Sequence, residues 1–182
     1  MIKKTSHILA SLVFITSILS VLVFVFGRPA QNIIDDTTIS SPVENKYYQV
    51  VKIVDGDTID VNINGKTERI RLIGIDTPET VDNNKPIECF GPEATKKAKE
   101  LLSNQQVRLE ADPNQDDSDT YNRLLRYVFR DDGLFFNEWM ITNGYAHEFT
   151  FIYPYKYQTK FKQAELEARN NNLGMWEVGI CD

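Results

Sequence analysis

Side chains that bind transition metals are scarce in this sequence. Its 182 residues include only two cysteines and two histidines. Two cysteines alone cannot form a structural zinc site, and His7 lies in an N-terminal apolar segment. His147 has no evident orienting partner in the sequence, so we assign it a structural rather than a catalytic role. The composition therefore excludes a structural zinc module.

Positive charge is also scarce. The formal net charge is −6, and residues 1–27 hold two lysines and no acid, so the remainder carries 18 basic against 26 acidic residues, a net charge of −8. Proteins that coat nucleic acid have a strongly basic footprint, which this chain lacks. A weakly bound substrate that is converted at a metal site is still compatible with this charge.

A long uncharged run sets the N-terminus apart. Residues 8–26 carry no charge and follow two lysines, and about 20 apolar residues suffice to cross a bilayer as a helix. Arg28 and Pro29 come directly afterwards and disfavour signal cleavage. We therefore expect residues 1–27 to be an uncleaved membrane anchor with the lysines inside; a cleaved signal that secretes the protein is the alternative.

Either outcome predicts an extracytoplasmic location for the rest of the chain. Residues 28–45 are rich in Ser, Thr, Asn, Asp and Pro and predict a flexible linker. Residues 46–182 have room for one domain with its own core, which we expect to be monomeric. In an oxidising compartment Cys89 and Cys181 are compatible with a disulfide, but their sequence separation leaves the pairing open.

Hydrophobic periodicity predicts a small closed β-barrel with helices packed on it, an α+β fold. Asn64-Gly65 suits a type I′ turn between two strands. We expect five strands, over residues 48–54, 58–63, 66–75, 106–111 and 124–130. Apolar residues at helical spacing predict three helices, over residues 92–102, 136–143 and 158–171.

Acidic residues stand at the ends of the predicted hairpin. Folding at its turn brings Asp57, at the start of one strand, beside Asp76, at the end of the next, and Thr77 adds a hydroxyl and a carbonyl. Carboxylates with additional oxygens suit a hard cation such as Ca²⁺. Spacing alone favours a plainer interpretation, in which Asp55 to Asp57 is only a turn and Asp76 only a cap.

Two arginines and a glutamate are candidates for the chemistry. Arg71 interrupts an apolar strand, and a buried guanidinium needs either a phosphate or a carboxylate as its partner. The alternation that places Leu125 and Tyr127 on one face extends back to Arg123, which should point inwards at the mouth of the core. Glu79 could hold or deprotonate water, although a single glutamate also fits a surface position.

Weaker candidates for substrate contact are Tyr121, Tyr153 and Lys85. A tyrosine ring can stack on a base, although core packing explains these tyrosines equally well. Lys85 is the only cation between residues 81 and 88.

Taken together, the motifs resemble the thermonuclease family of the staphylococcal nuclease type. The matching stretches keep their order and spacing from about residue 48 to residue 176. They are VDGDT (54–58), RLIGIDTPET (71–80), FGPEA (90–94), YNRLLRYV (121–128), NEWMITNGYA (137–146) and LGMW (173–176).

The resemblance implies a five-stranded OB-type barrel with three helices. It also implies Ca²⁺-dependent hydrolysis of DNA and RNA to 3′-phosphorylated products. By position, Asp57, Asp76 and Thr77 correspond to the metal site of the family, and the catalytic residues correspond to Arg71, Glu79 and Arg123. Two positions depart from the family pattern, with Asn122 in place of a usual glycine and Thr120 in place of a lysine that helps to bind nucleotide. These departures bear on substrate affinity more than on the reaction.

Two other functions compete with a nuclease. One is a non-catalytic OB module at the cell surface that binds nucleic acid without cutting it, but it predicts loss of Arg71, Glu79 or Arg123, all of which are present. The other is an exported structural or ligand-binding OB domain whose arginines are ion-paired. That function predicts no dependence on Ca²⁺.

Overall fold

The computed structural model describes residues 46–80 and 86–181. The predicted anchor (1–27), the predicted linker (28–45) and Lys85 lie outside these residues. Within the described ranges, none of the helices has both the length and the apolar character needed to cross a membrane.

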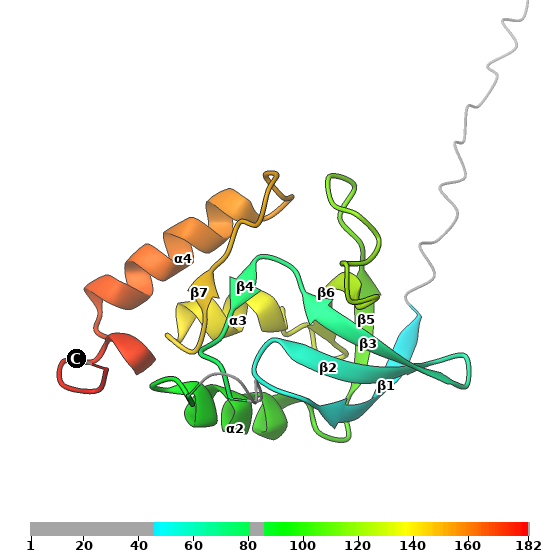
Figure 1. Cartoon of the computed structure of the whole chain (residues 1–182), viewed down its shortest axis with the longest axis horizontal. Coiled ribbons are helices and arrows are strands. Elements are labelled where there is room, and N and C mark those ends of the chain that lie inside the picture. The colour runs from blue at the N-terminus through cyan, green and yellow to red at the C-terminus, as the bar shows by residue number, and fades with distance from the viewer. Residues whose placement is uncertain (1–45, 81–85, 182) are drawn as a thin grey trace, which may run out of the picture. The chain divides into compact units, whose positions relative to one another are not determined.

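Five strands close into a barrel, which confirms the predicted fold (Figure 1). Around the barrel the order is β1-β2-β3-β6-β5, with β5 pairing back to β1, and only the β3–β6 contact is parallel. The strands are β1 (Tyr47–Ile53), β2 (Thr58–Ile63), β3 (Lys66–Leu72), β5 (Gln106–Glu110) and β6 (Leu124–Arg130).

The turn between β2 and β3 forms at Asn64-Gly65, as predicted. Both residues have positive φ, 54° and 88°, which a type I′ turn requires and which asparagine and glycine tolerate. This turn sets the register that pairs Thr58, at the start of β2, with Arg71, near the end of β3.

The described residues form three α-helices, α2 (Gly91–Leu102), α3 (Phe136–Thr142) and α4 (Gln158–Asn170). Helix α2 packs against β1, while α3 lies between β6 and α4 (Figure 1). The barrel interior and the helix faces share one apolar core, whose largest fully buried side chains include Tyr127, Phe136 and Phe161.

The predicted third strand extends beyond the end of the observed strand β3. It was expected to reach Ile75 but ends at Leu72, because Gly74 has a φ of 78° and turns the chain. Strand β4 (Ile75–Asp76) instead pairs with β7 (His147–Glu148) in a separate two-stranded sheet. The backbone of Asp76 therefore pairs with His147, in the segment that follows α3, while its carboxylate accepts a hydrogen bond from Arg71 of β3.

Candidate active site

Barrel topology places the candidate residues at one end of neighbouring strands. Asp57 immediately precedes β2, and its carbonyl accepts a hydrogen bond from the Leu72 amide at 2.9 Å. The parallel register pairs Arg71 with Leu125. The start of β6, which Arg123 precedes, therefore lies beside the end of β3.

Arg71 is the centre of a polar cluster. Its Nη1 donates to the carbonyl oxygens of Leu72 and Ile75, at 2.9 and 2.7 Å. Its Nη2 donates to Asp76 Oδ1 at 2.8 Å, and its Nε lies 3.3 Å from Asp57 Oδ1. With only 14% of its side chain exposed, Arg71 therefore has the partners that a largely buried guanidinium requires.

Asp57 connects the barrel to the segment that follows β4. Its Oδ2 accepts hydrogen bonds from the Thr77 amide at 2.8 Å and the Thr77 hydroxyl at 3.1 Å. Both residues are buried. The plainer interpretation of this region is thus only half right. Asp55 does form a turn, accepting from the Asp57 amide at 3.0 Å, but Thr77 is held by Asp57 and not by a cap from Asp76.

Asp55 is a member of this cluster that the sequence did not single out. Burial, followed by the negative charge of Asp57, raises the pKa of Asp55 to about 7. Burial also raises the pKa of Asp76, while the Arg71 guanidinium lowers it and Asp57 adds to the increase. The D-G-D spacing of residues 55–57 places Asp55 close to Asp57, but the same spacing is typical of a turn.

Glu79 lies three residues beyond β4 and is half-buried. Its Oε1 accepts a hydrogen bond from the Thr80 amide at 2.8 Å. Its backbone is held from both sides by Glu88, because the Glu79 amide donates to Glu88 Oε2 at 2.9 Å and the Glu88 amide donates to the Glu79 carbonyl at 3.0 Å.

Arg123 is ion-paired at the start of β6. Its Nε donates to Asp119 Oδ2 at 2.6 Å, and its amide donates to Asp119 Oδ1 at 2.9 Å. The guanidinium also lies 5.4 Å from the centre of the exposed Tyr121 ring. Arg123 is therefore positioned by a carboxylate while 28% of its side chain stays exposed to solvent.

This constellation agrees with what sequence comparison finds. The family model described as "Staphylococcal nuclease homologue" matches residues 69–178. The chain belongs to this family.

Several proteins similar to this nuclease homologue have names that describe nucleases. It is 39% identical over 136 residues to the thermonuclease of Staphylococcus hyicus, covering 75% of this chain and 79% of that protein. With the thermonuclease of Staphylococcus intermedius the identity is 40% over 138 residues, covering 76% and 80%. An endonuclease of Bacillus subtilis, YncB, is 37% identical over 127 residues, covering 69% and 59%.

The cluster around Arg71 has the chemistry of a site for a hard cation. The carboxylates of Asp55, Asp57 and Asp76 lie around the guanidinium of Arg71, and burial is the main cause that raises the pKa of Asp55 and of Asp76. Across residues 46–80 and 86–181, no three His, Cys, Asp or Glu side chains form a complete metal cluster. A cation here would need further oxygen ligands, from Thr77, water or phosphate. Ca²⁺ is commonly coordinated by such mixed sets of oxygen ligands.

The two tyrosine candidates of this nuclease homologue are exposed, Tyr121 by 79% and Tyr153 by 64%. The carbonyl of Tyr153 accepts a hydrogen bond at 3.1 Å from Gln115, which lies in the same acidic loop as Tyr121. Exposure leaves both rings available for stacking and removes core packing as an explanation for them.

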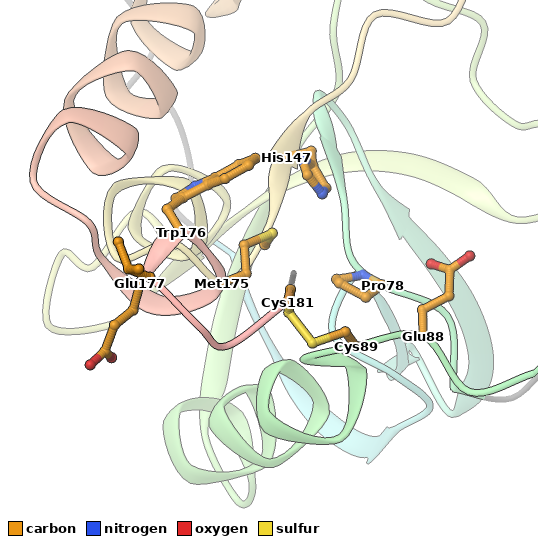
Figure 2. A pocket seen from close by; sticks show the side chains of 9 residues that line it. Pro78, Glu88, Cys89, His147, Met175, Trp176, Glu177 and Cys181 are labelled. Atoms are coloured by element: carbon orange, nitrogen blue, oxygen red, sulfur yellow. A yellow bond between two sulfur atoms is a disulfide. The ribbon is translucent and has the colours of Figure 1, made fainter.

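A pocket of about 440 Å³ lies beside the candidate residues (Figure 2). Pro78 and Glu88 line it on the side of the Glu79 segment, and Trp176 and His147 line it on the other. His147 lies edge-on to Trp176 at 4.9 Å, and its Nδ1 is 3.3 Å from Glu165. Glu165 is a partner of His147 that the sequence does not reveal, and the structural role of His147 stays a prediction.

Proposed function

We propose that this staphylococcal nuclease homologue is a Ca²⁺-dependent nuclease that hydrolyses DNA and RNA to 3′-phosphorylated products. The observation that carries the proposal is the placement of Arg71 between Asp57 and Asp76 at the end of β3, beside the start of β6. Family membership supports the same chemistry.

In this proposal two guanidinium groups bind the scissile phosphate. Backbone carbonyls hold Nη1 of Arg71, so its fork stays oriented while Nε and Nη2 exchange carboxylate oxygens for phosphate oxygens. Arg123 is held in place through its Nε, which donates to the Asp119 carboxylate. Both cations then stabilise the additional negative charge of the five-coordinate transition state.

Asp57, Asp76 and Thr77 would hold Ca²⁺ through their oxygens. When bound, the cation supplies positive charge next to the phosphate. Glu79 orients or deprotonates a water molecule, whose oxygen forms a new bond to phosphorus. The bond from phosphorus to the 5′ oxygen breaks, and that oxygen leaves as a hydroxyl after it takes up a proton.

An extracytoplasmic location is part of the proposal. Its support is the uncharged N-terminal run together with the disulfide between Cys89 and Cys181, since such bonds persist in oxidising compartments. We propose that residues 1–27 anchor the protein in the membrane.

One experiment tests the proposed function. Full-length protein in detergent should cut linear DNA and RNA in CaCl₂ and lose this activity in excess EGTA. We expect Glu79→Gln and Arg123→Ala each to lower kcat by about a hundredfold or more. Lys99→Ala, at an exposed position on α2, is the control and should keep full activity.

Undiminished cutting by both variants would refute the assigned roles. If the wild-type protein binds DNA but does not cut it, the non-catalytic binding module becomes the better description. If neither binding nor cutting depends on Ca²⁺, a structural or ligand-binding OB domain with ion-paired arginines becomes the better description.

A further inference from the structure

We infer that the disulfide between Cys89 and Cys181 is a positioning element for Glu79 and acts through Glu88. The inference rests on the proposed function for its kinetic consequence only. Its structural part concerns how the base of one loop is held, and this part can be measured without any cutting of nucleic acid.

The first link runs from Glu79 to Glu88. Two hydrogen bonds join them, one from the Glu79 amide to the Glu88 carboxylate and one from the Glu88 amide to the Glu79 carbonyl. They join the backbone of Glu79 to both the side chain and the backbone of Glu88. Any displacement of Glu88 therefore moves the backbone that carries the Glu79 carboxylate.

The second link is the tight turn after Glu88. Phe90 has a φ of 67°, and a Cβ added to Gly91 would come within 2.8 Å of the Pro78 carbonyl and 3.1 Å of the Glu79 carbonyl. The start of α2 is thus packed directly on the backbone of the Glu79 segment. Cys89 lies between Glu88 and Gly91 in the chain, so a displacement of Cys89 would disturb the contacts that both residues make with the Glu79 segment.

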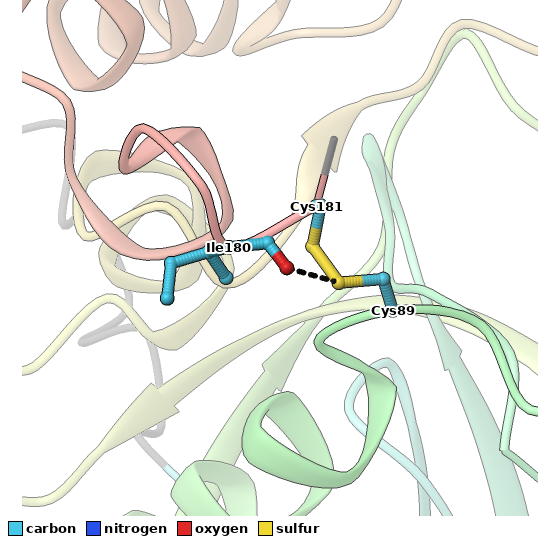
Figure 3. The surroundings of a disulfide bond; sticks show 3 residues. All are labelled: Cys89, Ile180 and Cys181. Atoms are coloured by element: carbon cyan, nitrogen blue, oxygen red, sulfur yellow. Dashed lines mark hydrogen bonds between the residues drawn. A yellow bond between two sulfur atoms is a disulfide. The ribbon is translucent and has the colours of Figure 1, made fainter.

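The third link is the disulfide itself (Figure 3). Cys181 lies 92 residues after Cys89, and the carbonyl oxygen of Ile180 lies 3.1 Å from the Cys89 sulfur. Among the described residues, the hydrogen bond from the Ile180 amide goes to Glu177, within the same C-terminal segment. The disulfide is therefore the covalent connection between this segment and the loop base.

The fourth link anchors the C-terminal segment to the body of the protein. It follows η1 (Gly174–Trp176), where the Met175 amide donates to the Gly144 carbonyl at 2.9 Å. A Cβ on Gly144 would meet the Leu173 carbonyl oxygen at 2.0 Å, so these backbones are in direct contact. A chain of fixed contacts thus runs from the end of α3 to Glu79.

This arrangement is suited to holding a catalytic carboxylate. A displacement of about 1 Å in a group that acts on the reacting atoms can cost on the order of a hundredfold in rate. Both Cys89 and Glu88 are exposed, so burial alone does not hold them in place. Asp57 and Thr77 are held in place by burial. Cys89 and Glu88 are restrained by the disulfide instead.

The kinetic test compares full-length wild-type protein with Cys89→Ser/Cys181→Ser, Glu88→Ala and Glu88→Gln, well below the unfolding temperature of each. We expect kcat to fall about tenfold in the disulfide variant and in Glu88→Ala, with KM changed less than about twofold. Glu88→Gln should retain kcat, because its amide oxygen still accepts from the Glu79 amide. Glu93→Ala, in the first turn of α2, is the charge-matched control and should retain kcat too.

Combining the changes separates positioning from general destabilisation. Because Glu88→Ala already removes the carboxylate contact, removing the disulfide in this variant should lower kcat by a smaller factor than it does in the wild-type protein. Reduction of the wild-type protein by dithiothreitol, which gives two electrons and two protons to the disulfide and becomes a cyclic disulfide, should reproduce the loss. Full kcat without the disulfide, or fully multiplicative effects, would overturn the inference.

Hydrogen exchange decides the structural part independently. Loss of the disulfide should speed exchange of the Glu79 amide by about tenfold or more, while amides in β2 and β3 keep their rates. An unchanged Glu79 amide refutes the inference whatever the activity. An inactive wild-type protein with the expected exchange pattern would instead refute the proposed function and leave the positioning intact.

Discussion

In the proposed function, Arg71 and Arg123 both bind a phosphate. Each guanidinium is held by carboxylates, Arg71 by Asp57 and Asp76 and Arg123 by Asp119. These pairs keep the planar donor groups in place before any substrate arrives, so less side-chain entropy is lost on binding. The structural and the phosphate-binding interpretations of these arginines are therefore compatible.

The pairing of Asp119 with Arg123 predicts a pH-dependent contribution to stability. Burial raises the pKa of Asp119, but hydrogen bonds from the Arg123 amide and guanidinium outweigh it and hold the pKa below its ordinary value. A lowered pKa in the folded state stabilises the protein above the unfolded pKa, and this stability is lost as the pH falls through the folded pKa. Asp119→Asn should therefore cost roughly 1–2 kcal/mol at pH 7, and the difference should shrink below about pH 4.

Urea unfolding of both proteins at pH 7 and at acid pH measures this difference. Asp116→Asn, at an exposed position in the same loop, is the control and should change the unfolding free energy little at either pH. A cost for Asp119→Asn that is the same at both pH values would show that the charge of Asp119 is not what stabilises the loop.

At this scale the sequence indicates what a residue needs but not which residue provides it. A guanidinium in an apolar strand implies an anionic partner, and Arg71 has two. The partners of Arg123 and Glu79, which are Asp119 and Glu88, lie in loops whose path depends on tertiary contacts. No periodicity reports such contacts, so neither partner could be predicted.

At the scale of elements, the strands and helices follow from hydrophobic pattern and turn chemistry, and the prediction fails where tertiary contact overrides them. Apart from Arg71, residues 70–75 carry no polar side chain, yet β3 ends at Leu72 because the chain turns at Gly74. Strand β7 has only two residues and depends entirely on β4, so it carries no pattern of its own. Both departures shape the position of Asp76.

Gly74 should therefore be sensitive to substitution. In Gly74→Ala the new Cβ would meet the Tyr155 and Phe161 rings at 2.7 and 2.8 Å, in addition to the strain of a positive φ. We expect a loss of about 3 kcal/mol in unfolding free energy. Gly133→Ala is the matched control, since its φ of 91° is similar but nothing lies within 4 Å, and it should cost about 1 kcal/mol.

Denaturant unfolding of the two variants compares these costs directly. Equal losses would show that backbone strain alone matters at Gly74. A larger loss for Gly74→Ala, together with reduced cutting of DNA in Ca²⁺, would connect the packing of Tyr155 and Phe161 to the position of β4.

At the scale of the whole molecule, the net negative charge of the protein opposes the binding of nucleic acid. Beyond residue 27 the chain carries a net charge of −8, so long-range electrostatics repel a polyanion rather than attract it. In the proposed function the favourable charge is local, consisting of two arginines and a bound cation. The protein should therefore release its substrate readily, as a catalyst requires.

This balance predicts a shallow salt dependence for DNA binding. Each neutralised phosphate contributes about −0.9 to the slope of log K against log salt, so one phosphate bound by both arginines gives a slope of about −1. Binding of fluorescent DNA to full-length Glu79→Gln protein, at constant CaCl₂ and varied KCl, measures this slope. Adding Arg123→Ala should weaken binding and make the slope shallower, whereas adding Lys99→Ala should leave both the affinity and the slope unchanged. A slope steeper than about −5 would mean that many more cations contact the backbone, and the small arginine site would then not account for substrate binding.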